Sequence, residues 1–156
     1  MAILRSMTDQ DYGEFYSQSI IDYAEDKVTA GTWAPSEAQK LSSQEFERFL
    51  PEGLNTPNSY LYAVIDPLLE VKVGHLWIHI SDGPLGRSAF IYDIVIYETY
   101  QGKGYGTQTM TALEEEAKRL QINKISLHVF GHNKTAFGLY QKMGYEITDI
   151  SMSKKI

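Results

Sequence analysis

The chain has 156 residues, of which 43% are hydrophobic and 22% charged, and its formal net charge is -6. Its length favours a single domain over residues 1–156, and the absence of cysteine excludes disulfides, thiol nucleophiles and cysteine-bound metal clusters. No apolar run approaches the roughly 20 residues that span a bilayer, and the excess of acidic side chains argues against a nucleic-acid surface. We therefore expect a cytoplasmic protein whose acidic surface serves either solubility or a cationic partner such as an amine.

The first third of the sequence predicts two helices. Thr8 and Asp11 form a helix-start pattern, and apolar residues then recur at helical spacing until Gly31. Ser42 and Glu45 repeat the start pattern and predict a second, shorter helix.

The remaining two thirds predict a sheet interrupted by helices. The expected elements are strands over 60–65, 71–80 and 89–97, a helix through Leu120, a strand over 124–130, a helix over 133–143 and a final strand over 145–153. The first three strands form an antiparallel meander, whereas the strand–helix–strand unit that follows requires a parallel pair. The sequence therefore predicts an α+β fold with a mixed sheet.

Glycines are concentrated between the third of these strands and the long helix. Gly102, Gly104 and Gly106 let the backbone approach a ligand, and the N-terminus of the helix favours an anion such as phosphate. The spacing matches neither an ATP P-loop nor a dinucleotide fingerprint, because Thr107 stands where a third glycine would be needed. Taken alone, the loop is equally compatible with a structural turn.

Two motifs together indicate a family. The string from Tyr100 to Gly106 resembles the pyrophosphate loop of the GNAT superfamily of acyl-CoA N-acyltransferases. The family pattern is Gln or Arg, any two residues, Gly, any residue, and then Gly or Ala. In this chain Gln101, Gly104 and Gly106 occupy the three defined positions. The segment 133–145 is similar to the second family signature in residue types and spacing. The resemblance covers the whole element order, although residues 1–58 match only as two variable helices. It implies a GNAT fold, with a central mixed and mostly antiparallel sheet, splayed strands and flanking helices.

The resemblance also implies acetyl-CoA as a co-substrate. Its pyrophosphate would contact the backbone amides of the glycine loop, and its pantetheine would run along the third strand of the meander. The cofactor-binding residues implied in this way are Ile94, Val95, Ile96, Gln101, Gly102, Lys103, Gly104, Tyr105, Gly106, Thr107, Asn133 and Tyr140. Asn133 also fits the N-cap of the helix that follows, and both roles can hold at once.

Two residues are candidates for proton transfer. Tyr140 matches the family tyrosine that acts as general acid toward the leaving sulfur, although it also fits a core aromatic of its helix. Asp93 interrupts an apolar strand and is either the general base or a structural carboxylate. Several relatives place the catalytic carboxylate one residue earlier, where this chain has Tyr92, and Glu98 is a weaker candidate.

The histidines give no metal site. His75 and His79 share a strand face, but four residues at about 3.3 Å each separate them by roughly 13 Å, too far for one ion. His79 and His128 are either proton acceptors near the substrate or ordinary sheet histidines, and His132 fits a loop.

These observations predict an N-acetyltransferase in which a primary amine attacks the thioester directly, with no metal. The acceptor, a small-molecule amine or a protein amine, is not determined by the sequence, and residues 12–58 are expected to cover its side of the site. A non-catalytic CoA-binding sensor or scaffold and a nucleotide-binding protein are the alternatives. A homodimer is suggested only by analogy with similar proteins.

Overall fold

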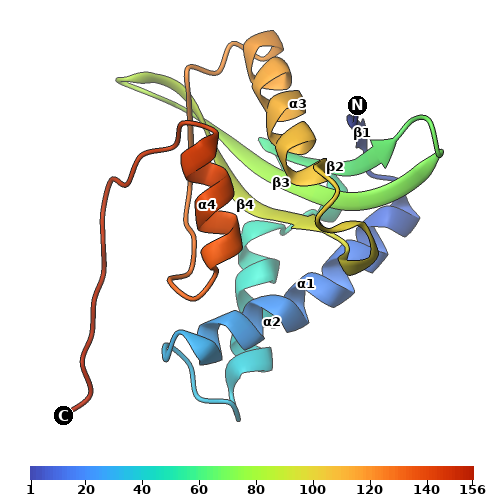
Figure 1. Ribbon diagram of the computed structural model, residues 1–156. Coiled ribbons are helices and arrows are strands. Elements are labelled where there is room, and N and C mark those ends of the chain that lie inside the picture. The colour runs from blue at the N-terminus through green and yellow to red at the C-terminus, as the bar shows by residue number, and fades with distance from the viewer.

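The computed structural model describes residues 1–156 and confirms an α+β fold, with helices on both faces of one five-stranded sheet (Figure 1). The strands are β1 (Ile3–Ser6), β2 (Ser59–Asp66), β3 (Val71–Gly83), β4 (Gly86–Ile96) and β5 (Lys124–Leu127), and they lie side by side in chain order. The helices are α1 (Asp9–Thr29), α2 (Ala38–Phe49), α3 (Tyr105–Arg119) and α4 (Lys134–Lys142), with short 3₁₀ turns at Gly53–Asn55 and Glu98–Tyr100. None of the helices combines the length and hydrophobicity that crossing a bilayer requires.

The sheet separates two apolar cores. Under α3 and α4, the side chains of Leu76, Ile78 and Met110 are fully buried. On the opposite face, Phe15 of α1 packs with Trp77 of β3 in a smaller aromatic core. Alternation along β3 explains this division, because successive residues of a strand point to opposite faces.

The start of α1 follows the sequence prediction. Thr8 accepts a hydrogen bond from the amide of Asp11, and the Asp11 carboxylate accepts one from the amide of Thr8, which completes a capping box. Asp11 also pairs with Arg5 of β1 at 2.7 Å and with Lys72 of β3 at 2.9 Å. Burial opposes ionisation of Asp11, but these hydrogen bonds hold its pKa below the ordinary value. One carboxylate thus joins β1, α1 and β3.

A β-bulge in β4 decides which way the middle of that strand faces. Ile78 pairs with Ile91, but the preceding residue of β3, Trp77, pairs with Asp93. Tyr92 is therefore the extra residue, and Tyr92 and Asp93 both lie on the face covered by α1 and α2. With regular alternation Asp93 would instead enter the apolar core under α3.

The parallel pair separates toward one end. β4 and β5 pair only from Ser88 with Lys124 to Ile91 with Leu127, and β4 continues to Ile96 without a β5 partner. This is the splayed arrangement that the sequence resemblance implies. The backbone groups of β4 beyond Ile91 are left open toward β5.

Three expectations were wrong in detail, and one strand was missed. The short strand β1 was not predicted, and α2 begins at Ala38, so Ser42 lies inside it and donates to the carbonyl of Ile20 at 2.7 Å. The strand expected over 124–130 ends at Leu127. The final strand expected over 145–153 does not form. This segment runs away from the body of the protein and has no strand beside it to pair with (Figure 1).

Candidate active site

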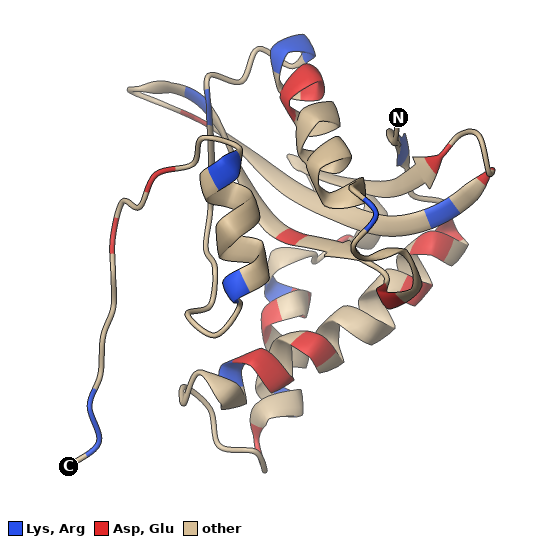
Figure 2. Ribbon diagram, in the orientation of Figure 1, with Lys and Arg blue, Asp and Glu red and all other residues tan.

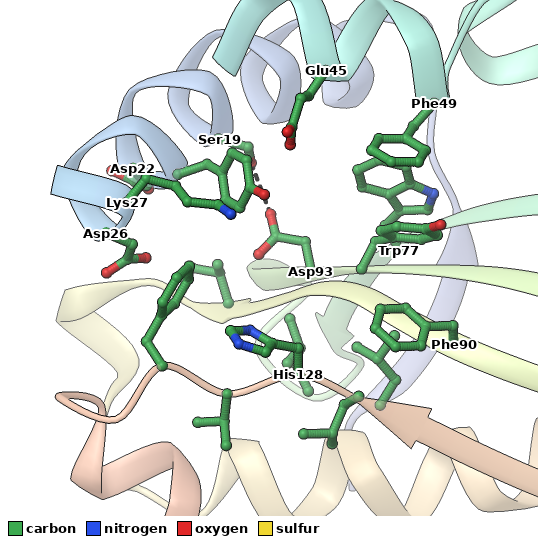
Figure 3. Close-up of a pocket in the computed structure, with 18 of the residues that line it drawn as sticks. Ser19, Asp22, Asp26, Lys27, Glu45, Phe49, Trp77, Phe90, Asp93 and His128 are labelled. Carbon is green, nitrogen blue, oxygen red and sulfur yellow. Dashed lines mark hydrogen bonds between the residues drawn. The ribbon is translucent and has the colours of Figure 1, made fainter. Parts of the chain in front are cut away.

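A cavity of about 480 Å³ opens where β4 and β5 separate, under α1 and α2 (Figure 3). Five of the predicted site residues line it: Asp93, Ile94, Val95, Asn133 and Tyr140. Ile96 and the loop over 101–107 do not line it. The structure therefore brings both candidates for proton transfer to one cavity and leaves the glycine loop beyond its edge.

Asp93 is held by two hydrogen bonds. Ser19 of α1 donates to Asp93 Oδ2 at 2.9 Å, drawn as a dashed line in Figure 3, and His75 Nε2 lies 3.0 Å from the same oxygen. The Asp93 side chain keeps 25% of its surface exposed. Its second oxygen, Oδ1, makes no hydrogen bond within the protein and is free to meet a ligand.

His75 lies behind Asp93 rather than in the cavity. Its side chain is only 4% exposed and packs edge-on against Phe15 at 4.9 Å between ring centroids. Its Nδ1 atom is buried without a partner. The tautomer with the proton on Nε2 donates to Asp93 and leaves no buried donor unpaired, so we assign it here.

Tyr140 of α4 lines the same cavity and is 8% exposed. Burial, together with the Asp93 carboxylate, raises the pKa of Tyr140 to about 12. The hydroxyl therefore keeps its proton at neutral pH and can act as a hydrogen-bond donor.

The glycine loop presents unpaired amides at the start of α3. Gly102 and Gly104 have φ angles of 75° and 88°, in the left-handed region that side chains avoid. Gly104 is the N-cap of α3, and the first helical hydrogen bond runs from the amide of Gln108 to its carbonyl. The amides from 102 to 107 accordingly have no backbone acceptor, which suits an anion.

Neighbouring contacts fix the loop in place. The side chain of Gln101 donates to the carbonyl of Ile96 at 2.8 Å, and the Tyr105 hydroxyl donates to Asp66 at 2.5 Å. A Cβ atom on Gly106 would lie 3.1 Å from Leu139 of α4, so a glycine lets α3 and α4 approach closely. Lys103 extends over the ring of Tyr100, 5.9 Å from its centroid.

Asn133 caps α4. Its Oδ1 accepts from the amide of Ala136 at 3.2 Å, and the residue also lines the cavity. The helix-capping role is therefore present.

The other candidate side chains have different positions. His79 bonds to Ser59 at 3.2 Å and does not line the cavity, and neither does Glu98, in a 3₁₀ turn. His128 lines the cavity, where burial and the nearby Lys27 lower its pKa. His132 bonds to Asp26 at 2.9 Å.

Carboxylates from α1 and α2 surround the mouth of the cavity. α1 carries six acidic side chains and one basic side chain, and acidic residues recur along it in Figure 2. Asp22 and Asp26 of α1 and Glu45 of α2 line the cavity (Figure 3). Its two cations each lie over an aromatic ring: the ammonium of Lys27 lies 5.4 Å from the Tyr23 ring centroid, and Arg48 lies 4.8 Å from the Phe49 ring centroid.

Ser19, His75 and Glu45 are the site residues that sequence reasoning missed. Ser19 lies 74 positions from Asp93 in the chain, and no local motif marks it. One weak indication pointed to His75, because the strand that carries it was expected to pair with the strand that carries Asp93. The bulge at Tyr92, which turns Asp93 toward His75, has no equivalent signal in the sequence.

Comparison with known proteins points to one family. The model of the acetyltransferase (GNAT) family matches residues 9–145. YycN, an uncharacterized N-acetyltransferase of Bacillus subtilis (strain 168), is 44% identical over 154 residues, covering 99% of this chain and 98% of YycN. YdgE of the same strain, also an uncharacterized N-acetyltransferase, is 36% identical over 153 residues, covering 98% and 97% of the two chains.

Solved structures give the same result. The crystal structure of YycN matches with a TM-score of 0.96 at 43% identity, covering 100% of this chain and 99% of that chain. The structure of a predicted acetyltransferase with acetyl-CoA from Clostridium acetobutylicum shares the fold, with a TM-score of 0.64 at 20% identity over 99% of this chain and 96% of that chain. The chain belongs to the GNAT family of acetyltransferases.

Proposed function

We propose that this protein transfers the acetyl group of acetyl-CoA to a primary amine by direct attack. The observation that supports this most is the shared cavity. A carboxylate fixed by Ser19 and a tyrosine that keeps its proton, Asp93 and Tyr140, line it together where β4 and β5 separate.

The residues around the opening fit coenzyme A. The unpaired amides of 102–107 suit a diphosphate, and the open backbone of 94–96 suits the amides of pantetheine. The related fold from Clostridium acetobutylicum was solved with acetyl-CoA, which supports the same co-substrate here. Bound there, acetyl-CoA would supply an activated acyl group.

The protein's own residues can account for the protons. Asp93 accepts one proton from the acceptor ammonium, which frees the lone pair of the amine to form the new N–C bond. Tyr140 donates its proton to the sulfur as the C–S bond breaks and recovers one from the acylated nitrogen. The products are an amide and the thiol of CoA, and Asp93 releases its proton to solvent. With no cysteine in the chain, no thiol is available for an acyl-enzyme.

The cavity favours an alkyl amine that carries a second positive charge. Asp93 lies at one side of the cavity, where it would meet the reacting nitrogen. Glu45 points into the same cavity from α2 (Figure 3). The cavity is also lined by the carboxylates of Asp22 and Asp26, so its four acidic side chains outnumber the two cations, Lys27 and Arg48. Glu45 lies beside the Tyr23 hydroxyl and Asp93 beside the Ser19 hydroxyl, both neutral groups. A diamine would place a positive charge beside each carboxylate, whereas a singly charged amine reaches only one of them.

A panel of amines with free-thiol detection tests both parts of this proposal. The chain has no cysteine, so no protein thiol contributes to the signal. We expect turnover with alkyl diamines and, for Glu45→Gln, a rise of about tenfold in the diamine KM with little change for monoamines. Glu47→Gln, on an exposed position of the same helix, is the matched control.

Three results would contradict all or part of the proposal. Equal KM values for diamines in the wild type and Glu45→Gln would remove the assigned acceptor class but leave acetyl transfer intact. Binding of acetyl-CoA with no thiol release across the panel would favour a non-catalytic CoA sensor. Binding of ATP or NAD in place of CoA would favour a nucleotide-binding protein.

A further inference from the structure

His75 is a buried polar side chain whose presence the aromatic core does not explain. The side chain is 4% exposed and packs edge-on against Phe15. Its Nδ1 atom is buried without a hydrogen-bond partner, which costs free energy of folding that an apolar side chain would not cost. What the ring does provide is Nε2, 3.0 Å from Asp93 Oδ2. We therefore look for the role of His75 in this contact.

The register of the sheet brings His75 and Asp93 together. His75 of β3 pairs with Val95 of β4, two residues beyond Asp93. His75 and Asp93 are thus diagonal neighbours, and a diagonal spacing of roughly 7–8 Å is within reach of a long side chain. The contact depends on the bulge at Tyr92, because the bulge places Asp93 on the face of the sheet that carries His75.

Both hydrogen bonds to Asp93 reach the same oxygen. Ser19 donates to Oδ2 at 2.9 Å, and with the Nε2–H of His75 it occupies both lone pairs of that atom. Oδ1 makes no hydrogen bond within the protein, and it is directed away from Ser19 in Figure 3. A rotation of the carboxylate that exchanged the two oxygens would break both bonds. A proton that arrives from the cavity is thus received by Oδ1.

We propose that His75 is a positioning residue for acetyl transfer and that it acts through Asp93. Its Nε2–H holds Oδ2 and so keeps Oδ1 directed at the acceptor nitrogen. The proton passes from the acceptor ammonium to Oδ1, and His75 keeps its own proton throughout. His75 does not line the cavity, so it has no direct contact with the amine or the thioester. This role rests on the proposed function, in which Asp93 is the proton acceptor.

Three substitutions of His75 test the hydrogen bond. His75→Leu removes the donor and keeps a side chain of similar size, whereas the amide of His75→Gln carries a donor close to the position of Nε2. Since the loss lies in orientation for proton transfer and not in binding, we expect His75→Leu to lower kcat about tenfold with both KM values unchanged. His75→Gln should recover most of this rate. His75→Asn, which is too short to reach Asp93, should match leucine and replaces it where leucine prevents folding.

His79→Leu is the matched control for these substitutions. His79 lies on the same face of β3, but it bonds to Ser59 at 3.2 Å and does not line the cavity. It should retain the wild-type kcat, measured by thiol release on proteins with unchanged circular dichroism. A wild-type kcat for His75→Leu or His75→Asn, or a His75→Gln protein as slow as these two, overturns the proposal.

Asp93→Asn separates positioning from a general effect on the protein. The amide oxygen of asparagine can accept from Ser19 and His75, but the amide nitrogen that replaces Oδ1 takes no proton. We expect Asp93→Asn to lower kcat about 100-fold and the double variant Asp93→Asn/His75→Leu to lower it no further. A further tenfold loss in the double variant would show that His75 does not act through Asp93. A wild-type rate for Asp93→Asn would instead remove the general base of the proposed function, and the role of His75 with it.

Discussion

At the scale of single residues, the proton on Tyr140 matters most for the proposed chemistry. Tyr140 lines the cavity and its hydroxyl is protonated at neutral pH, because burial and Asp93 raise its pKa to about 12. We expect Tyr140→Phe to lower kcat by about 100-fold or more with little change in either KM, since proton donation acts in the transition state. Steady-state rates from thiol release measure this.

The control for this substitution is Tyr62→Phe. Tyr62 is also buried, and burial and Glu116 raise its pKa, but it donates to Glu116 on the far side of the sheet and does not line the cavity. It should retain the wild-type rate. If Tyr140→Phe also retained it, the proton for the leaving sulfur would come from another group or from water.

At the scale of elements, local patterns were predictable and long-range pairings were not. The capping box of α1 and the buried stripe of α3 follow from residues three or four positions apart. β1 exists only because it pairs with β2, some sixty residues away, and the bulge at Tyr92 depends on how β4 meets β3. The segment over 145–153 shows the reverse case, a strand pattern with no adjacent strand.

The turn before α3 gives a prediction at this scale. Gly104 has a φ of 88°, where an L-residue costs about 1–2 kcal/mol, so Gly104→Ala should lower the free energy of unfolding by about 1 kcal/mol. Because the strain also displaces the loop amides, we expect the KM for acetyl-CoA to rise about tenfold. Urea unfolding and acetyl-CoA titration of the rate measure the two effects.

Gly13→Ala is the control, and it should change the free energy of unfolding in the opposite direction. Gly13 lies within α1 and has open space around it, so alanine there should stabilise the helix by up to about 1 kcal/mol without altering the KM. A Gly104→Ala protein with wild-type stability and an unchanged KM would show that this turn does not hold the loop.

At the scale of the whole molecule, the motifs predicted the family and the fold, but only part of the site. The candidates on β4 and α4 meet at one cavity because Asp93 and Tyr140 belong to elements that the motifs themselves define. Ser19 and Glu45 come from the two helices where the family resemblance is weakest. Their positions depend on how α1 and α2 pack across the sheet, which no local pattern specifies.

Two tyrosines, Tyr140 buried and Tyr145 partly buried, connect stability to alkaline pH. Burial, together with nearby charged groups, raises the pKa of both Tyr140 and Tyr145 to about 12, two units above the ordinary 10. A raised pKa contributes stability that is fully present below pH 10 and is lost as pH rises toward 12, at about 1.4 kcal/mol per unit for each group. The urea midpoint should therefore fall steeply above pH 10. Tyr140→Phe/Tyr145→Phe should flatten that fall, and an identical slope would contradict these pKa values.

One of the two tryptophans lines the cavity. Trp77 lines the cavity and stacks on Tyr92, with 4.7 Å between ring centroids, whereas Trp33 packs outside it against Tyr23. A Trp33→Phe protein would thus carry a single tryptophan, at the cavity. Its emission could report occupancy without any label, and could separate binding of the amine from the chemical step.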